Sequence, residues 1–290
     1  MSDFHGLPTK SLENGHLKLD YLTTAGPRLV RLMVAGSDKN ILAEVPATSV
    51  ETPWGTFNFI GGHRLWHAPE AMPRTYVPDD QGFSFEEQSD GSLRLSKEET
   101  PIGITKHMDV KLAADSASLT LAHTLVNTGI WGVELAPWSI TQLALGGIAI
   151  LPLPTKQTGL LPNRRMSVWP YSRLTDQRLV WDEAFIAFKG DPSLPPFKIG
   201  YFSEDGWTGY YNNGVFFRKE YEVIDGLTYP DFGSNTEMFC NDEFIELEAV
   251  AAMVPLEPQD SVTMSETWTL YTDPDKVPGL TDEMRAVLSK

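Results

Sequence analysis

Side chains that could bind a polar ring and transfer protons to it lie close together near residue 60. The segment reads Asn58-Phe-Ile-Gly-Gly-His-Arg-Leu-Trp-His-Ala-Pro-Glu70. Its glycine pair, Gly61 and Gly62, allows a sharp turn or a close approach of a ligand to the backbone. Imidazole titrates near neutral pH, arginine donates hydrogen bonds, and a tryptophan ring can pack on the C–H face of a sugar. Two interpretations stay open: a binding site, or a strand–loop junction with a packed tryptophan and a satisfied histidine.

Two glutamates late in the chain have the spacing of paired catalytic carboxyls. In Phe244-Ile-Glu-Leu-Glu-Ala-Val-Ala251, Glu246 and Glu248 share one face of a predicted strand, roughly 7 Å apart. Both faces of the strand are partly apolar. Such surroundings raise the pKa of a carboxyl, which suits a general base or acid near neutral pH. The alternative is a solvated strand face.

A third glutamate, Glu266, is the polar member of an otherwise apolar strand face. Val262, Met264, Trp268 and Leu270 share that face. A buried carboxylate needs a partner such as arginine, or it stays protonated. We expect a structural ion pair here rather than a catalytic group, because buried ion pairs are commonly structural.

Metal ligation has little support in the sequence. His123 shares a predicted strand face with three leucines of residues 118–127, so we expect a hydrogen-bonded core histidine. No two histidines have the helical spacing of zinc ligands, and Cys240 is the only cysteine. We therefore predict no metal site, while calcium binding by scattered acidic residues is left open.

Alternating apolar and polar residues predict strands through most of the chain. The expected strands cover residues 16–21, 83–86, 92–96, 104–112, 118–127, 131–145, 147–153, 184–189, 197–203, 207–211, 214–223, 243–254 and 261–271. The best helical signal is at residues 281–290, and residues 155–183 are typical of a long functional loop. We predict an all-β protein, a large antiparallel β-sandwich with few short helices, in one domain covering residues 1–290.

Composition limits the possible partners. The formal net charge of −16 argues against nucleic acid and makes anionic sugars less favourable ligands. A single cysteine and no recognisable signal peptide or membrane span favour a cytoplasmic protein without membrane contact. No Walker loop, dinucleotide fingerprint or nucleophile elbow occurs, so we expect no cofactor. The oligomeric state is open.

Several of these segments, in this order, resemble the galactose-mutarotase-like, or aldose 1-epimerase-like, β-supersandwich. The likeness runs from about residue 15 to 272. It includes the Gly-Gly segment with its arginine, the Asn127-Thr-Gly129 turn, and Leu247-Glu248 near the end of the chain. One departure is clear: where the epimerases have a His-x-Tyr-Phe-Asn segment with their acid histidine, this chain reads Pro137-Trp138-Ser139. The phrase Glu134–Gln142 is closer to an uncharacterised branch of the superfamily.

The resemblance implies a sugar site with a carboxylate base. Glu248 falls on the family's base, and His63 or His67 could supply the missing acid. Substrate-binding side chains would be Arg64, Trp66, Glu70, Trp138, Trp169 and Glu246. The implied reaction is mutarotation of an aldose or a related epimerisation, in which the base takes the proton of the anomeric hydroxyl and the acid protonates the ring oxygen.

Two other functions remain open. A non-catalytic glycan-binding module would use the same cleft and need no acid–base pair, and the tryptophan at the expected histidine position favours it. A sugar lyase would need a tyrosine or histidine base near an arginine. Tyr171 and Tyr229 are available for that role, with little weight. The ligand is either a small or an oligomeric carbohydrate.

Overall fold

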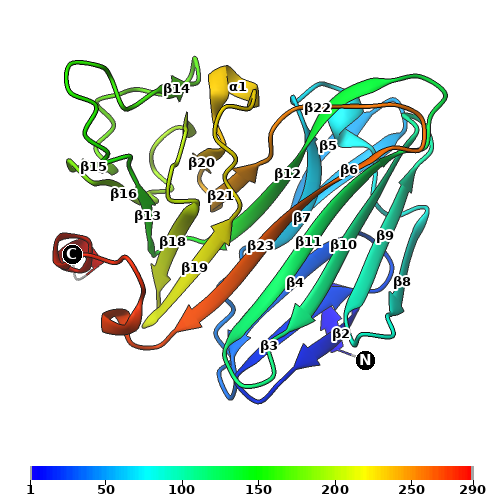
Figure 1. Ribbon diagram of the computed structural model, residues 1–290. Coiled ribbons are helices and arrows are strands. Elements are labelled where there is room, and N and C mark those ends of the chain that lie inside the picture. Colours follow the sequence, from blue (N-terminus) through cyan, green and yellow to red (C-terminus); the bar gives the residue numbers. More distant parts are fainter. Residues whose placement is uncertain (1, 289–290) are drawn as a thin grey trace.

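Two antiparallel sheets packed face to face make up most of the computed structural model, which describes residues 2–288 (Figure 1). The first sheet contains, in spatial order, β1 (Ser2–Phe4), β2 (Leu7–Glu13), β3 (Leu17–Leu22), β4 (Arg28–Val34), β7 (His63–Ala68), β12 (Val133–Ala144), β21 (Phe244–Val250), β20 (Thr236–Cys240), β17 (Phe197–Tyr201) and β14 (Met166–Val168), with β22 (Val254–Leu256) paired to β12. The second contains β15 (Leu179–Trp181), β16 (Phe185–Lys189), β13 (Ile148–Pro152), β18 (Trp207–Asn212), β19 (Val215–Tyr221), β23 (Ser261–Tyr271), β11 (Ser118–Asn127), β10 (Ile104–Leu112), β9 (Leu93–Glu99) and β8 (Phe83–Glu87).

The remaining elements are small. They are the hairpin β5 (Glu44–Thr52) and β6 (Gly55–Gly61), the short helices η1 (Arg74–Tyr76), α1 (Pro230–Gly233) and η2 (Pro274–Lys276), and the helix α2 (Asp282–Leu288). The predicted all-β sandwich with few helices is confirmed. Among residues 2–288, no helix is both long and apolar enough to span a lipid bilayer.

Strand alternation builds the core between the sheets. Along β10, Ile104, Met108 and Val110 are buried while Thr105, His107 and Asp109 are partly exposed, as the sequence pattern predicts. β10, β11 and β23 have the predicted bounds. Apolar side chains from both sheets meet in one large cluster, so each strand gives one face to this core and the other to the outside of the sandwich.

The Gly61–Gly62 pair allows two backbone segments to lie in contact. The two residues have φ of +105° and +70°. A Cβ on Gly61 would lie 2.2 Å from the carbonyl oxygen of Ala43, and one on Gly62 would lie 2.0 Å from that of Leu29. Only glycine fits both the backbone conformation and the space, so the pair sets where β7 enters the first sheet.

A buried polar cluster joins the two sheets inside the core. Lys219 Nζ donates to Ser139 Oγ at 2.7 Å and to Thr141 Oγ1 at 3.1 Å. It also lies 3.4 Å from Oε1 of Glu266. The indole of Trp268 donates to Oε2 of Glu266 at 2.8 Å. The predicted structural ion pair of Glu266 is confirmed, with a lysine rather than an arginine as its partner.

Two histidines complete this cluster. His63 Nε2 and His123 Nε2 are 2.8 Å apart, and His63 Nδ1 is 3.0 Å from Thr141 Oγ1. The prediction that His123 is a hydrogen-bonded core histidine is confirmed. Ligand atoms of His63, His123 and Glu266 lie within 4.8 Å of one another, a spacing a metal ion could bridge. The ring-to-ring hydrogen bond and the ammonium of Lys219 already use these atoms.

Replacing Gly62 by alanine should unfold the protein at lower urea than replacing Gly15. Both residues have positive φ, but a Cβ on Gly15 meets nothing within 4 Å. For Gly15→Ala we expect the free energy of unfolding to fall by about 1 kcal/mol, because alanine is strained at positive φ. For Gly62→Ala we expect a fall of more than about 3 kcal/mol, because a carbonyl group must also move. Equal losses in urea unfolding would contradict this account of the glycine pair.

Acidification should destabilise the protein through His123. Burial lowers the pKa of His123 to about 4; Glu266 opposes this shift and Lys219 adds to it. In the unfolded chain it titrates near 6.5. Between these values the unfolded state binds the proton and the native state does not, so stability falls as pH falls, by about 2 kcal/mol between pH 7 and 5.

Urea unfolding at pH 7 and pH 5 tests this. Between pH 7 and pH 5, the free energy of unfolding of His123→Gln should fall by about 2 kcal/mol less than that of the wild type. Substitution of the exposed His16 by glutamine should leave the wild-type loss unchanged. The same pH dependence in His123→Gln and the wild type would refute the assignment.

Candidate functional site

The residues of the early motif divide between the two faces of β7. His63–Ala68 forms the strand β7 rather than a loop, and all six residues of this strand are buried. His63 packs edge-on against Trp268 of the second sheet, with ring centroids 4.7 Å apart. His67 points the same way, and its Nε2 lies 3.8 Å from Oε2 of Glu99 on β9. The hypothesis that His63 or His67 supplies an acid to the cleft is therefore wrong, because both face the sandwich interior.

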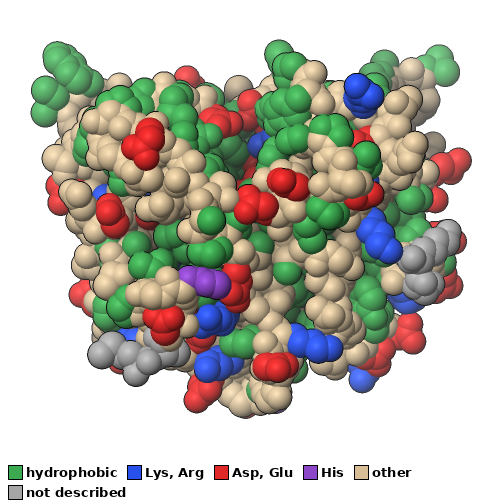
Figure 2. All heavy atoms as spheres, turned by 180° about the vertical axis from the view of Figure 1, so that it is seen from behind, with side chains coloured by type: hydrophobic (Ala, Val, Ile, Leu, Met, Phe, Trp, Pro, Cys, Tyr) green, Lys and Arg blue, Asp and Glu red, His purple; other side chains and the backbone are tan. Residues whose placement is uncertain are grey.

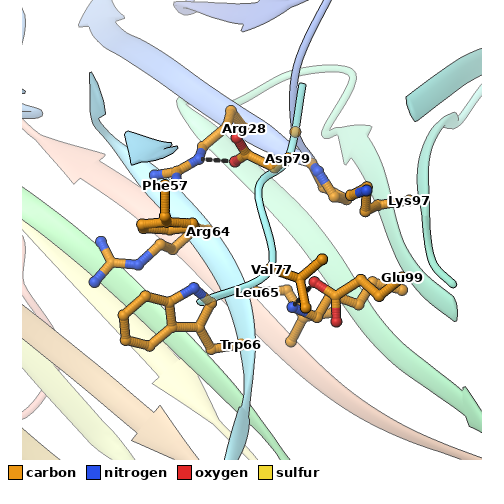
Figure 3. Close-up of a pocket in the computed structure, with 12 residues that line it drawn as sticks. Arg28, Phe57, Arg64, Leu65, Trp66, Val77, Asp79, Lys97 and Glu99 are labelled. Atoms are coloured by element: carbon orange, nitrogen blue, oxygen red, sulfur yellow. Dashed lines mark hydrogen bonds and ion pairs between the residues drawn. The ribbon is translucent and has the colours of Figure 1, made fainter. Parts of the chain in front are cut away.

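Arg64 and Trp66 point to the opposite, outer face of the first sheet. The guanidinium of Arg64 lies 4.3 Å from the ring centroid of Trp66. Figure 3 shows these two side chains together, with Arg28 beside them. Arg28 donates to Oδ2 of Asp79 at 2.7 Å and to the carbonyl of Phe59 at 2.7 Å, so it holds the loops around the site.

Strand register brings the late glutamates to the same face. Arg64 is opposite Ile140, Ile140 is opposite Glu248, and Glu248 is opposite Glu237. Two residues earlier on β21, Glu246 is opposite Gln142 of β12 on one side and Phe239 of β20 on the other. The predicted sharing of one strand face by Glu246 and Glu248 follows from this register, and the structure places both beside Arg64.

Glu246 is held by two nitrogen donors. Arg64 Nη2 and Gln142 Nε2 each donate to its Oε1 at 3.0 Å. The Nε and Nη1 atoms of Arg64 are buried and have no hydrogen-bond partner among the described residues. A buried guanidinium with unused donors is suited to bind hydroxyl oxygens of a ligand.

Glu248 accepts hydrogen bonds from two buried donors, an indole and an ammonium. Trp138 Nε1 donates to Oε2 of Glu248 at 2.7 Å, and Lys198 Nζ donates to the same oxygen at 2.9 Å. Lys198 also lies 2.7 Å from Oε2 of Glu237. Sequence reasoning missed Lys198 and Glu237. Each is a charged residue inside a buried strand, the same signal that singled out Glu266.

The three carboxyls share two cations, which changes their protonation. Burial raises the pKa of Glu246; Arg64 opposes this rise and Glu248 adds to it. Burial also raises the pKa of Glu237 well above its ordinary value, although Lys198 opposes it. For Lys198 burial acts to lower the pKa, but Glu237 and Glu248 outweigh it and hold the pKa well above the usual lysine value. Burial therefore acts against the charged form of Glu237 and Glu246.

Aromatic rings enclose a pocket of about 180 Å³ above these charges. Its lining includes Phe59, Arg64, Trp66, Glu70, Tyr76, Trp138, Tyr171, Lys198, Phe239 and Glu246. Trp169 borders the same region, since Lys198 Nζ lies 4.7 Å from its ring centroid. Figure 2 views the molecule from the side of the first sheet and shows a hollow between two lobes in the upper half, with acidic side chains around it.

The geometry of its lining distinguishes this pocket from the larger hollows of the surface. Hollows of about 460 Å³ and 520 Å³ lie beside β16 and over the outer face of β11 and β23. Neither combines stacked aromatic rings with a buried guanidinium that has unused donors. The pocket of about 180 Å³ has aromatic rings, a buried guanidinium and a buried carboxyl in its lining.

Comparison with known proteins identifies the fold. No protein-family model matches the sequence, and no curated protein matches it either. Three solved structures are similar over almost the whole chain. A candidate aldose 1-epimerase from Escherichia coli K12 has a TM-score of 0.58 and 14% identity, covering 92% of this chain and 99% of that one. A galactose mutarotase-like protein from Lactobacillus casei has a TM-score of 0.53 and 10% identity, covering 91% and 100%.

The third similar structure is a TPR-domain containing protein from Parabacteroides distasonis. Its TM-score is 0.64 at 14% identity, and the likeness covers 95% of this chain but 49% of that one. Identities this low carry the fold and not the activity. The chain has the fold of the galactose mutarotase-like proteins, at sequence identities of 10–14% to the structures compared.

Proposed function

We propose that the protein binds one ring of a neutral sugar in the pocket on the outer face of the first sheet. The observation that carries the proposal is the pocket walled by aromatic rings, with the guanidinium of Arg64 and the carboxyl of Glu246 in its lining. Sugar hydroxyls accept hydrogen bonds from such donors, and the C–H faces of a ring pack on tryptophan and tyrosine.

The charges around the pocket support a neutral ligand. Arg64 and Lys198 are balanced by Glu246, Glu248 and Glu237, so no net positive charge is left for a phosphate or a uronate. The overall charge of −16 repels anions as well. A neutral aldose, free or at the end of a glycan, is the ligand class that fits.

A second candidate function, anomer interconversion, has its own support. The pocket holds carboxyls in different environments, which is the arrangement that separates an acid from a base. Two similar structures carry names that refer to aldose 1-epimerase or galactose mutarotase. We propose an isomerase activity of this kind on the bound aldose; if binding occurs without it, the protein is a non-catalytic sugar-binding module.

Calorimetric titration with a panel of aldoses should detect binding that Tyr171→Ala weakens about fivefold to tenfold. Tyr171 lines the pocket, and its side chain is half-exposed, so its truncation removes a packing surface of roughly 1 kcal/mol without opening the core. Trp131→Ala is the matched control, because that ring is exposed on a turn away from the pocket. No binding by any aldose, or equal weakening by both variants, would overturn the proposal.

Polarimetry on a freshly dissolved pure anomer should show faster equilibration in the presence of the protein. A positioned acid and base each contribute about 10²–10⁴-fold to such a reaction. Two-dimensional exchange NMR at equilibrium provides an independent measurement. Binding with an unchanged interconversion rate would exclude the isomerase and leave the binding module.

A further inference from the structure

We propose that Glu246 and Glu70, rather than Glu248, are the acid and base that exchange protons with the bound sugar. This inference rests on the proposed sugar binding and concerns the residues that act on the ligand. It departs from the assignment that the resemblance implies, in which Glu248 is the base.

Access to the pocket separates Glu246 from Glu248. Glu246 lines the pocket and is 7% exposed, whereas Glu248 does not line it and is 1% exposed. The indole of Trp138 and the ammonium of Lys198 both donate to Oε2 of Glu248, and its Oε1 is buried. A sugar in the pocket reaches Glu246 and is separated from Glu248 by Trp138.

The two oxygens of Glu246 have different surroundings. Oε1 accepts from Arg64 and Gln142, so a proton on this oxygen would conflict with both donors. Oε2 has no partner among the described residues and, unlike Oε1 of Glu248, is not sealed from solvent. A proton on Glu246 would therefore sit on Oε2, on the side of the pocket. Burial raises the pKa of Glu246, which is the direction that suits an acid.

Glu70 provides a carboxylate at the pocket mouth. It is exposed, lines the same pocket and accepts a hydrogen bond from the hydroxyl of Tyr76. The Tyr76 ring packs on Trp66 with centroids 4.8 Å apart, which fixes the position of Glu70.

The proposed acid and base both belong to the lining of the pocket of about 180 Å³. Glu70 and Glu246 thus border one small space.

The proposed reaction is balanced without any other reactant. Glu70 takes the proton of the anomeric hydroxyl while Oε2 of Glu246 gives its proton to the ring oxygen. The bond between the anomeric carbon and the ring oxygen breaks, and an open-chain aldehyde forms. After rotation of the aldehyde, the ring oxygen attacks its other face, Glu246 recovers its proton and Glu70 returns its proton to the new anomeric hydroxyl.

Glu246→Gln and Glu70→Gln should each lower the protein-catalysed anomer exchange rate at least 100-fold, measured by exchange NMR at saturating aldose. Sugar affinity, measured by calorimetry, should change at most tenfold, because glutamine keeps the shape of each side chain. Glu246→Asp keeps a carboxyl group that can pair with Arg64. Because aspartate is one methylene shorter, its carboxyl lies farther from the sugar, so the exchange rate should also fall. Glu257→Gln, an exposed glutamate between β22 and β23, is the control for loss of one negative charge.

Each outcome separates this inference from the binding proposal. Loss of exchange in Glu248→Gln together with full exchange in Glu246→Gln or Glu70→Gln overturns the inference and restores Glu248 as the base. Sugar binding by the wild type without any exchange also overturns it, while sugar binding stands. If no aldose binds to the protein, the sugar-binding proposal and the assignment of Glu246 and Glu70 are both wrong.

Discussion

Buried charge on the outer face of the first sheet constrains the whole site. Three carboxyls and two cations lie side by side on neighbouring strands: Arg64, Lys198, Glu237, Glu246 and Glu248. Removing a charge from water is unfavourable unless a partner compensates it, so these groups fix one another's positions. The carboxyls exceed the cations by one, and burial raises the pKa of Glu237 and of Glu246.

The alternation of strands explains which parts of the fold were predictable. β10, β11 and β23 have one buried face and one polar face, so their bounds and facing residues could be read from the sequence. β7 is buried on both faces and has no alternation to detect. The segment after the glycine pair was therefore interpreted as a possible loop. On a strand, His63 and Arg64 must face opposite sides, and this rule alone separates the expected acid from the expected binding residue.

The site itself was predictable only where a charged residue stood out within its own strand. Glu246, Glu248 and Glu266 were found because each interrupts an apolar pattern. Lys198 and Glu237 do the same in β17 and β20, and the same test applied there would have found them. Their partnership with Glu248 could not be predicted, because it depends on the order of β21, β20 and β17 in the sheet, which local sequence does not encode.

Trp138 determines which carboxyls a ligand in the pocket could reach. An indole donates a hydrogen bond but does not accept or release a proton at ordinary pH. Trp138 lines the pocket and donates to Oε2 of Glu248, which does not line it, so the indole separates that carboxyl from the space open to a ligand. Any proton transfer in this pocket must therefore use carboxyls that the tryptophan does not cover, and the two in the lining of the pocket are Glu246 and Glu70.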